Sequence, residues 1–437
     1  MKIIEHIIEL ALKSAEQAEV FHVSNNGTIA TYEANRLKLM ETQATEGAAL
    51  RIIKNGRIGF AATTDLSNPQ SLVDTAVEVA PFGPYAKLAF PTKTTYPNVT
   101  TLDKSVENYQ AEKMVETGQT LIDQLRSIHA DVNCEGRVGK SFGTQTIMNS
   151  RGGIAQHTAS SFGVYLHGTL IQGEDMLFVG DGETSCSPIE DTDVILKSVT
   201  GQIENARKIA NSPSGSLPVI FTPHGVSSIL LGPLLTGFNG RTVLQGSSPL
   251  IGKLGQQILD SQITIWDDPT LSLVPGSSPS DDEGVASKRK IVIDQGIAAT
   301  FLYDLQTAGQ AGTASTGNGS RSLTSLPAPS STVLIINEGA ESYADMVRDI
   351  PDGIIVEQVL GAGQGNILAG EFNANVLLGY RINNGEIIGR VKDCVISGNV
   401  YNVLNSIEAI GTESRWIGGS LKTPAIYCRS VSVTSKE

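Results

Sequence analysis

The chain has 437 residues, of which 40% are hydrophobic, and a formal net charge of −13. This length allows two or three domains with ordinary cores, and no stretch approaches the roughly 18 consecutive apolar residues that a membrane helix needs. The acidic balance argues against nucleic-acid binding, which depends on Lys and Arg neutralising phosphates. We therefore expect no nucleic-acid partner and no membrane span.

The amino-terminal residues 1–6 carry one basic residue followed by an early acid, and they lack the apolar core and cleavage site of a signal peptide. We expect a cytoplasmic protein. Cys134, Cys186, Cys394 and Cys428 are widely spaced, with no Cys-x-x-Cys pair. In that compartment they predict reduced, partly buried thiols rather than a disulfide or zinc cluster.

Residues 1–211 predict an α+β domain with mostly antiparallel strands. Apolar residues recur at helical spacing over residues 2–19. Asn55-Gly56 predicts a hairpin turn, because both residues tolerate a positive φ. Further strands are expected at 20–23, 29–37 and 47–53 and along 130–178, with a turn at 149–153, and further helices at 69–79, 111–128 and 192–209.

The segment 211–216 has the composition of a linker, so residues 212–437 predict a second, β-rich domain. A helix is expected at 224–235, kinked or ended near Pro233, and another at 400–407. The segment 309–331 is rich in Gly, Ser, Thr and Pro and predicts a long functional or mobile loop. Strands are expected at 217–221, 263–266, 291–294, 298–303, 333–337, 354–360, 374–382, 386–395 and 426–433.

Few residues in the second half suggest chemistry. His224 is the only histidine after residue 167, and no His or Cys lies near it in the sequence, so a structural or capping role is favoured over metal ligation. The acidic groups Asp267-Asp268 and Asp281-Asp282-Glu283 offer paired carboxylates for acid/base work or cation binding. Neither group lies in a pattern that predicts burial, so solvated turn residues are favoured.

Several short motifs occur in a characteristic order, at 149–152, 218–221, 253–257, 263–269, 282–289, 382–387 and 395–399. Together they resemble the TldD/PmbA proteases, a family once named "modulator of DNA gyrase". The resemblance implies a two-domain α+β architecture with largely antiparallel sheets flanked by helices.

The same resemblance points to a missing metal site. Metal-bearing members hold zinc with a His-Glu-x-x-x-His helix and a later cysteine. The matching positions here are Gly232, Pro233 and Gly237, with the cysteine expected at about 414–417. A zinc peptidase needs about three protein ligands, an open position for water and a general base. The resemblance therefore implies the PmbA branch, also called TldE, with no cofactor in this chain and zinc in a partner subunit.

We accordingly expect a non-catalytic partner subunit of a TldD/TldE-type zinc metallopeptidase complex. The resemblance implies a heterodimer with a TldD-like zinc-bearing sister, whose channel accepts unfolded or extended peptides for maturation and proteolysis. Two alternatives remain open: a homodimeric peptide-binding module without cleavage, and a free-standing hydrolase. The hydrolase, or a channel lining, would draw on one set of residues: His224, Asp267, Asp268, Asp282, Glu283 and Trp416.

Overall fold

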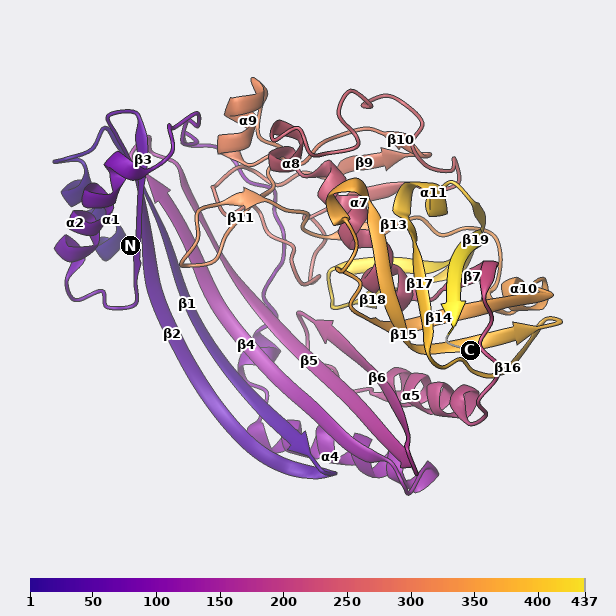
Figure 1. Cartoon of the computed structure of the whole chain (residues 1–437). Coiled ribbons are helices and arrows are strands. Elements are labelled where there is room, and N and C mark those ends of the chain that lie inside the picture. Colours follow the sequence, from indigo (N-terminus) through magenta and orange to yellow (C-terminus); the bar gives the residue numbers. More distant parts are fainter. Residues whose placement is uncertain (436–437) are drawn as a thin grey trace.

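A computed structural model describes residues 1–435, and it shows two large sheets flanked by helices (Figure 1). The α+β prediction is thereby confirmed. The amino-terminal half contains α1 (Lys2–Ala11), β1 (Gln17–Glu33), β2 (Arg36–Lys54), β3 (Arg57–Thr63), α2 (Pro69–Val79), the 3₁₀ turn η1 (Ala80–Phe82), α3 (Lys104–Glu107), α4 (Ala111–Ile128), β4 (Asn133–Asn149), β5 (Ile154–Gln172), β6 (Asp175–Ser185) and α5 (Asp193–Ala206).

The first sheet has six strands in the order β3-β2-β1-β4-β5-β6, and every neighbouring pair is antiparallel. Figure 1 shows its long strands sweeping as one curved layer from the α1–α2 lobe toward α4 and α5. Side chains alternate between the two faces of each strand. Tyr32 and Phe162 face α4, where the Tyr32 hydroxyl donates to the Val115 carbonyl oxygen over 2.8 Å. Their sequence neighbours therefore point to the opposite face.

In the first half, the helices with clear apolar periodicity and the Asn-Gly turn are predicted correctly. The predicted helices 69–79 and 111–128 match α2 and α4. Asn55 and Gly56 have φ of 49° and 69° in the turn between β2 and β3. The prediction of one helix over 2–19 is wrong beyond Ala11. Ala18 and Val20 instead alternate into the core from β1, which pairs with both β2 and β4.

The carboxy-terminal half is β-rich, as expected. It contains β7 (Gly215–Phe221), α6 (Pro223–Gly225), the π-helical turn η2 (Val226–Leu230), α7 (Leu231–Phe238), α8 (Gly240–Leu244), β8 (Ile265–Asp267), β9 (Lys290–Asp294), β10 (Ile297–Ala298), α9 (Leu305–Ala311), β11 (Gly319–Ser320), β12 (Ala328–Pro329), β13 (Leu334–Ile336), α10 (Tyr343–Arg348), β14 (Asp352–Leu360), the 3₁₀ turn η3 (Ile367–Ala369), β15 (Glu371–Asn383), β16 (Glu386–Arg390), β17 (Cys394–Asn399), α11 (Val400–Leu404), β18 (Ile407–Ile417) and β19 (Leu421–Ser435).

The second sheet has eleven strands, and part of it closes on itself. β19 pairs with β17 and also with β7, so the path β19-β17-β15-β14-β7 forms a ring. Buried apolar residues such as Phe221, Val356 and Ile396 belong to the core cluster of this half. A closed ring leaves no unpaired strand edges among its members, which makes this half a rigid support for the helix that follows β7.

Several boundaries in this half differ from expectation. The predicted strand 386–395 divides into β16 and β17, because Asp393 takes a φ of 48°. The strand predicted at 298–303 ends at Ala298, and the helix predicted at 400–407 ends at Leu404. The helix predicted to kink or end near Pro233 continues to Phe238. The α-helical hydrogen-bond pattern is interrupted before the proline instead, in the π-helical turn η2. α10 and β18 were not predicted.

The two halves share a core. One cluster joins Leu166 and Val179 of the first sheet to Ile355, Tyr380 and Tyr427 of the second. The division into domains 1–211 and 212–437 stays a prediction. The four cysteines are buried and unpaired. No helix within residues 1–435 is long and apolar enough to cross a membrane.

Candidate functional site

The helix that follows β7 carries the three positions matched to a metal motif. Thr222 begins it, with its hydroxyl accepting from the Gly225 backbone N–H over 3.3 Å. Gly225 is required here, since a Cβ at this position would lie 2.4 Å from the Val356 carbonyl oxygen. Ile229 and Leu234 are buried against the closed ring. The helix is thus held closely against β14, and the positions on α7 are well defined.

Gly232 and Gly237 lie in very different surroundings on α7. Gly232 is exposed, and a Cβ there would meet nothing within 4 Å. Gly237 is buried, and a Cβ there would lie 2.1 Å from the hydroxyl oxygen of Tyr401, which comes from α11. The space that a side chain at position 237 would need is therefore filled by Tyr401.

Zinc does not fit the residues present at these positions. Gly232, Pro233 and Gly237 supply no ligand atoms, and the segment matched to the third ligand, 414–417, lies in β18 and contains no cysteine. Across residues 1–435, no group of three or more His, Cys, Asp or Glu side chains is arranged to hold a metal ion. A zinc site needs about four ligand positions at close range, and this helix does not supply them.

His224 lies in α6, just before η2, and belongs to a partly buried polar group at the junction of the two halves. Its Nε2 lies 3.1 Å from Asp181 Oδ1, and Arg415 Nη1 lies 2.9 Å from Asp181 Oδ2. Burial opposes ionisation of Asp181, yet the hydrogen bond and charge of His224 and the charge of Arg415 lower the pKa of Asp181 to about 2. The expected structural role of His224 agrees with this pairing.

The pKa values of His224 itself and of Glu357 in β14 are also shifted. Burial lowers the pKa of His224, but Asp181 and Glu357 outweigh it, so the net shift is upward. Burial is also the main reason that the pKa of Glu357 is raised. Sequence analysis missed Asp181, although Leu177, Val179 and Asp181 recur at spacing two in a strand and therefore share a face. That alternation was a usable signal for a buried acid.

The acidic group 281–283 is not solvated, and the prediction of exposed turn residues is wrong for it. Glu283 is fully buried, and its Oε1 accepts from Arg51 Nη1 over 2.7 Å. Arg51 also donates to Glu19, which accepts in turn from Arg321 over 2.8 Å. Asp281 is buried and accepts from three backbone N–H groups. Asp282 is half-buried and accepts from the Gln145 side chain and the Arg321 backbone N–H.

The acidic group Asp267-Asp268 is also buried, so the prediction of solvated turn residues is wrong for it as well. Asp267 accepts from Lys290 Nζ over 3.1 Å, from the Asn318 amide over 2.7 Å and from the Thr332 hydroxyl over 2.5 Å. Asp268 is buried and accepts from the Thr270 hydroxyl. These carboxylates are occupied in holding chain segments together.

Segment 309–331 is ordered by the two acidic groups. Asn318 binds Asp267, the Gly319 N–H binds Asp281, and Arg321 binds Glu19 and Asp282. Inside the segment, β11 and β12 pair as a short ladder. The long loop is therefore tied to both halves of the molecule.

The hydrolase alternative required its acidic residues and His224 in one pocket. Their hydrogen-bond partners differ completely: Asp181 for His224, Lys290 for Asp267, and Arg51 for Glu283. Trp416 follows Arg415 in β18 and therefore points to the other face of that strand, away from Asp181. The carboxylates and His224 thus have different partners, and a single site that contains all of these residues stays a prediction.

Comparison with known proteins places this architecture in a family. Residues 214–435 match the family described as PmbA/TldA metallopeptidase C-terminal domain, and residues 18–80 match PmbA/TldA metallopeptidase domain 1. The chain is 27% identical over 427 residues to an uncharacterized protein of Methanocaldococcus jannaschii, covering 97% of this chain and 98% of that one. It is 24% identical over 430 residues to the metalloprotease PmbA homolog of Haemophilus influenzae, covering 93% and 90% of the two chains.

A solved structure shares the whole fold. The crystal structure of TldE from Thermococcus kodakarensis superposes with a TM-score of 0.90 at 23% identity, covering 99% of this chain and 100% of that one. At this level of identity the likeness shows the fold. The carboxy-terminal family match alone spans half of the chain, and the shared fold agrees with it. The chain therefore belongs to the PmbA/TldD family of metalloprotease-like proteins.

Proposed function

We propose that this chain is the non-catalytic subunit of a zinc metallopeptidase complex of the TldD/TldE type. The observation that carries the proposal is the packing on α7, where the Tyr401 hydroxyl fills the space beside Gly237 and the matched positions offer no ligand atoms. Zinc and the general base then belong to a TldD-like sister subunit, and the pair forms a heterodimer. The substrates are unfolded or extended peptides, in peptide maturation and proteolysis.

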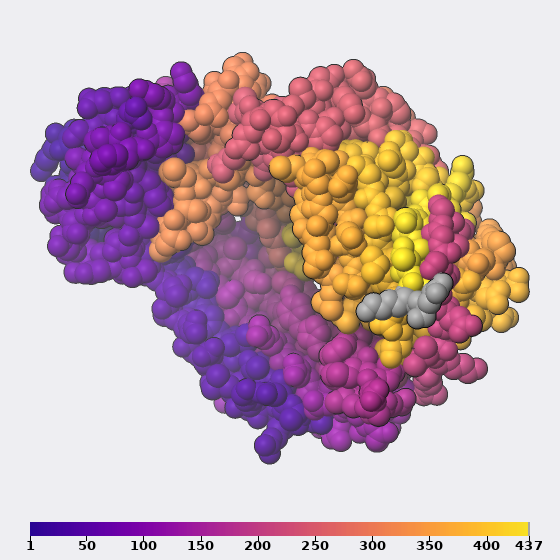
Figure 2. All heavy atoms as spheres, viewed as in Figure 1, coloured from indigo at the N-terminus to yellow at the C-terminus, as the bar shows by residue number. Residues whose placement is uncertain are grey.

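The face of the first sheet opposite α4 supports a path for peptides. Two adjoining hollows of about 440 Å³ and about 350 Å³ lie along it and share Ser141 and Ser161. Their lining combines small residues such as Gly139, Gly143 and Gly163 with larger ones such as Arg137 and Tyr165. Figure 2 shows the surface hollowed between this curved layer and the carboxy-terminal half. A peptide held here through its backbone would be bound with the low sequence selectivity that a peptidase of unfolded substrates needs.

The location that suits this proposal is the cytoplasm. All four cysteines are buried and unpaired, and burial raises the pKa of Cys134 and Cys186 to about 11, which keeps these thiols protonated and unreactive. A reducing compartment is where such thiols persist.

The deciding experiment measures cleavage of an unstructured peptide by this chain alone, by a zinc-bearing sister alone, and by their mixture, with zinc supplied. We expect no cleavage by this chain alone and cleavage by the mixture. Metal analysis of the purified chain should find far less than one zinc per chain, while the mixture gains zinc in proportion to the sister.

Two controls identify which subunit cuts the peptide. A sister with Gln in place of its motif glutamate should silence the mixture, which rules out a contaminating protease. Cleavage by this chain alone, resistant to chelators, would overturn the proposal and return attention to the carboxylate groups. A stable homodimer that binds the peptide, ignores the sister and does not cut would favour the binding-module alternative. Light scattering after size-exclusion chromatography distinguishes the two dimers.

A further inference from the structure

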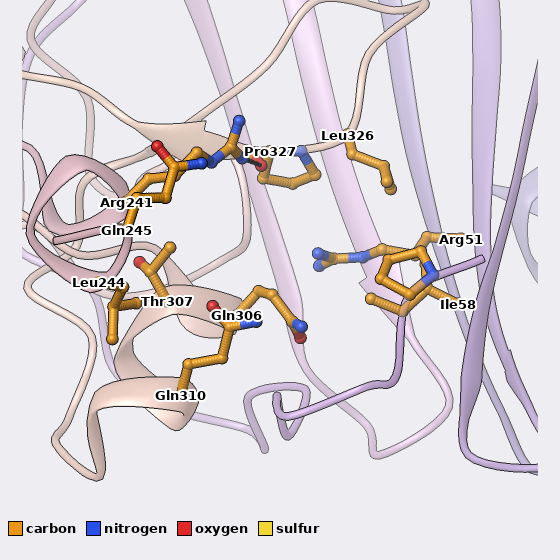
Figure 3. Close-up of a pocket in the computed structure, with 11 residues that line it drawn as sticks. Arg51, Ile58, Arg241, Leu244, Gln245, Gln306, Thr307, Gln310, Leu326 and Pro327 are labelled. Carbon is orange, nitrogen blue, oxygen red and sulfur yellow. Dashed lines mark hydrogen bonds between the residues drawn. The ribbon is translucent and has the colours of Figure 1, made fainter. Parts of the chain in front are cut away.

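A cavity of about 540 Å³ lies between the amino-terminal lobe and the carboxy-terminal half (Figure 3). Ile58 of β3 and Pro84 form one wall, and the opposite wall comes from α8, α9 and the segment before β12. The volume lies within the range of about 300–1,000 Å³ that small-molecule and peptide-end sites occupy. It is separate from α7, from the His224 group and from the hollows on the sheet face.

The charge of this cavity is unusual for an acidic chain. Its lining contains two arginines, Arg51 and Arg241, and no Asp or Glu, although the whole chain has a net charge of −13. Arg241 is exposed, its Nη2 donates to the Pro327 carbonyl oxygen over 3.3 Å, and no carboxylate within residues 1–435 forms an ion pair with it. Arg241 therefore presents an uncompensated positive charge to the cavity.

Arg51 lies on the other side of the cavity, where Glu19 and Glu283 already balance its charge. Figure 3 shows its guanidinium group pointing toward the middle of the cavity. Its two terminal nitrogens bind Glu283 and Glu19, while its Nε is buried and has no hydrogen-bond partner. The residue is only 1% exposed, so this unused donor is held in place by packing.

The amide side chains of the cavity divide into two kinds. Gln306 is fully engaged, since it donates to the Tyr85 carbonyl oxygen and accepts from the Lys87 N–H. Gln245 and Gln310 make no side-chain hydrogen bond to any residue that the structure describes. Each offers a donor and an acceptor, which is the pair that a peptide group needs. Leu244, Leu326 and Pro327 add apolar surface beside them.

We propose that this cavity binds the carboxyl-terminal end of an extended peptide. The carboxylate pairs with Arg241, the last peptide group bonds to Gln245 and Gln310, and an apolar final side chain packs on Leu244 and Leu326. The proposal deepens the proposed function, because it rests on peptides being the ligands of this chain. It gives one end of the peptide a fixed position at the junction of the two halves.

The test is calorimetric or NMR titration of the full chain with three probes. The first is acetyl-Ala-Leu with a free carboxylate, the second is its carboxyl-terminal amide, and the third is 4-methylpentanoate, which keeps the carboxylate and side chain without a peptide group. We expect the amide to bind about tenfold or more weakly than the acid, since charge-assisted hydrogen bonds dominate. The third probe should also bind more weakly than the first.

Variants connect the binding to these residues. Arg241→Gln should remove the difference between acid and amide, and Gln245→Ala should weaken both probes similarly. Arg429→Gln is the matched control, because Arg429 is an exposed arginine already paired with Glu408. Absence of binding, equal binding of acid and amide, an unchanged Arg241→Gln protein, or 4-methylpentanoate binding as well as the acid would each overturn the proposal. Such a result leaves the cleavage experiment with the sister unaffected, so the two failures are distinguishable.

Discussion

The buried charges of this protein occur in groups of opposite sign. Arg51 and Arg321 are at most 9% exposed, and they share the carboxylates of Glu19 and Glu283. Burial alone would lower the pKa of Arg51, but Glu19 and Glu283 more than compensate and raise it. Removing one member of such a group leaves the others charged and unpaired in a region of low dielectric constant.

Arg51→Met should therefore lower the free energy of unfolding by about 3–5 kcal/mol, because Glu19 and Glu283 lose their shared donor. Urea denaturation measures the change. The control is Arg429→Met, whose pair with Glu408 is exposed and should contribute only about 0–1 kcal/mol. Similar losses in the two variants would contradict the assignment of Arg51 to a buried structural group.

His224 gives a pH-dependent prediction. The pKa of His224 is raised above 6.5, so its contribution to stability is full below pH 6.5 and is lost as the pH rises through the raised value. The pKa of Asp181 is lowered from 3.8 to about 2, so its contribution is present above pH 3.8 and is lost as the pH falls through about 2. The pair is therefore fully formed between these limits.

His224→Gln should cost about 1–2 kcal/mol of unfolding free energy at pH 6 and clearly less at pH 9. Denaturation curves at several pH values measure this difference. His6→Gln, an exposed histidine on α1, serves as the control and should cost little at either pH. A loss that is the same at pH 6 and pH 9 would refute the ion pair.

At the scale of one element, α7 shows how the same residue type can have opposite roles. Gly232 and Gly237 are five positions apart on one helix. The first faces open space and the second faces the Tyr401 hydroxyl at 2.1 Å from the Cβ it lacks. Helix propensity decides the effect of substitution at the first position, and packing decides it at the second.

Gly232→Ala should raise the free energy of unfolding by about 0.5–1 kcal/mol, because alanine loses less backbone entropy in a helix. Gly237→Ala should lower it by about 1–3 kcal/mol through overpacking. The double variant Gly237→Ala with Tyr401→Phe should recover part of that loss, since the nearest atom is removed. If Gly237→Ala were as stabilising as Gly232→Ala, Tyr401 would not occupy the space as described.

At the scale of the whole molecule, the two halves are joined by a shared core. Residues of the first sheet pack with Ile355, Tyr380 and Tyr427 of the second. The group of Asp181, His224 and Arg415 crosses the same junction, and segment 309–331 ties Glu19 to the carboxy-terminal half. A chain linked this way should unfold as one unit despite its length.

The predicted division at residues 211 and 212 can be tested by expressing 1–211 and 212–437 separately. Each fragment should expose apolar surface, bind a hydrophobic dye and lack a cooperative thermal transition, whereas the full chain should show one transition. Co-expression should restore an associated, folded pair. Two separate transitions in the full chain, each matching an independently folded fragment, would contradict the shared core and support autonomous domains.

The elements that sequence analysis placed correctly are those with local causes. Asn68 caps α2 through the Ser71 N–H, with Pro69 at the first helical position, and Asn55-Gly56 closes a hairpin by its positive φ values. That Gly232, Pro233 and Gly237 offer no side-chain ligand atoms is a property of the residue types themselves, in any fold. Such features depend on a few neighbouring residues and not on contacts with distant parts of the chain.

The remaining features depend on segments far apart in the chain. The local sequence around Glu283 predicts a solvated turn residue, but in the structure Glu283 is bound by Arg51 of β2. No local pattern shows that Tyr401 fills the space beside Gly237. The cavity between Arg51 and Arg241 likewise exists only when the two halves meet. The sequence by itself determined the class of fold and the strongest helices and turns. Only the tertiary structure decided which charges are buried and which cavities form, because burial and pairing are set by long-range contacts that no local pattern encodes.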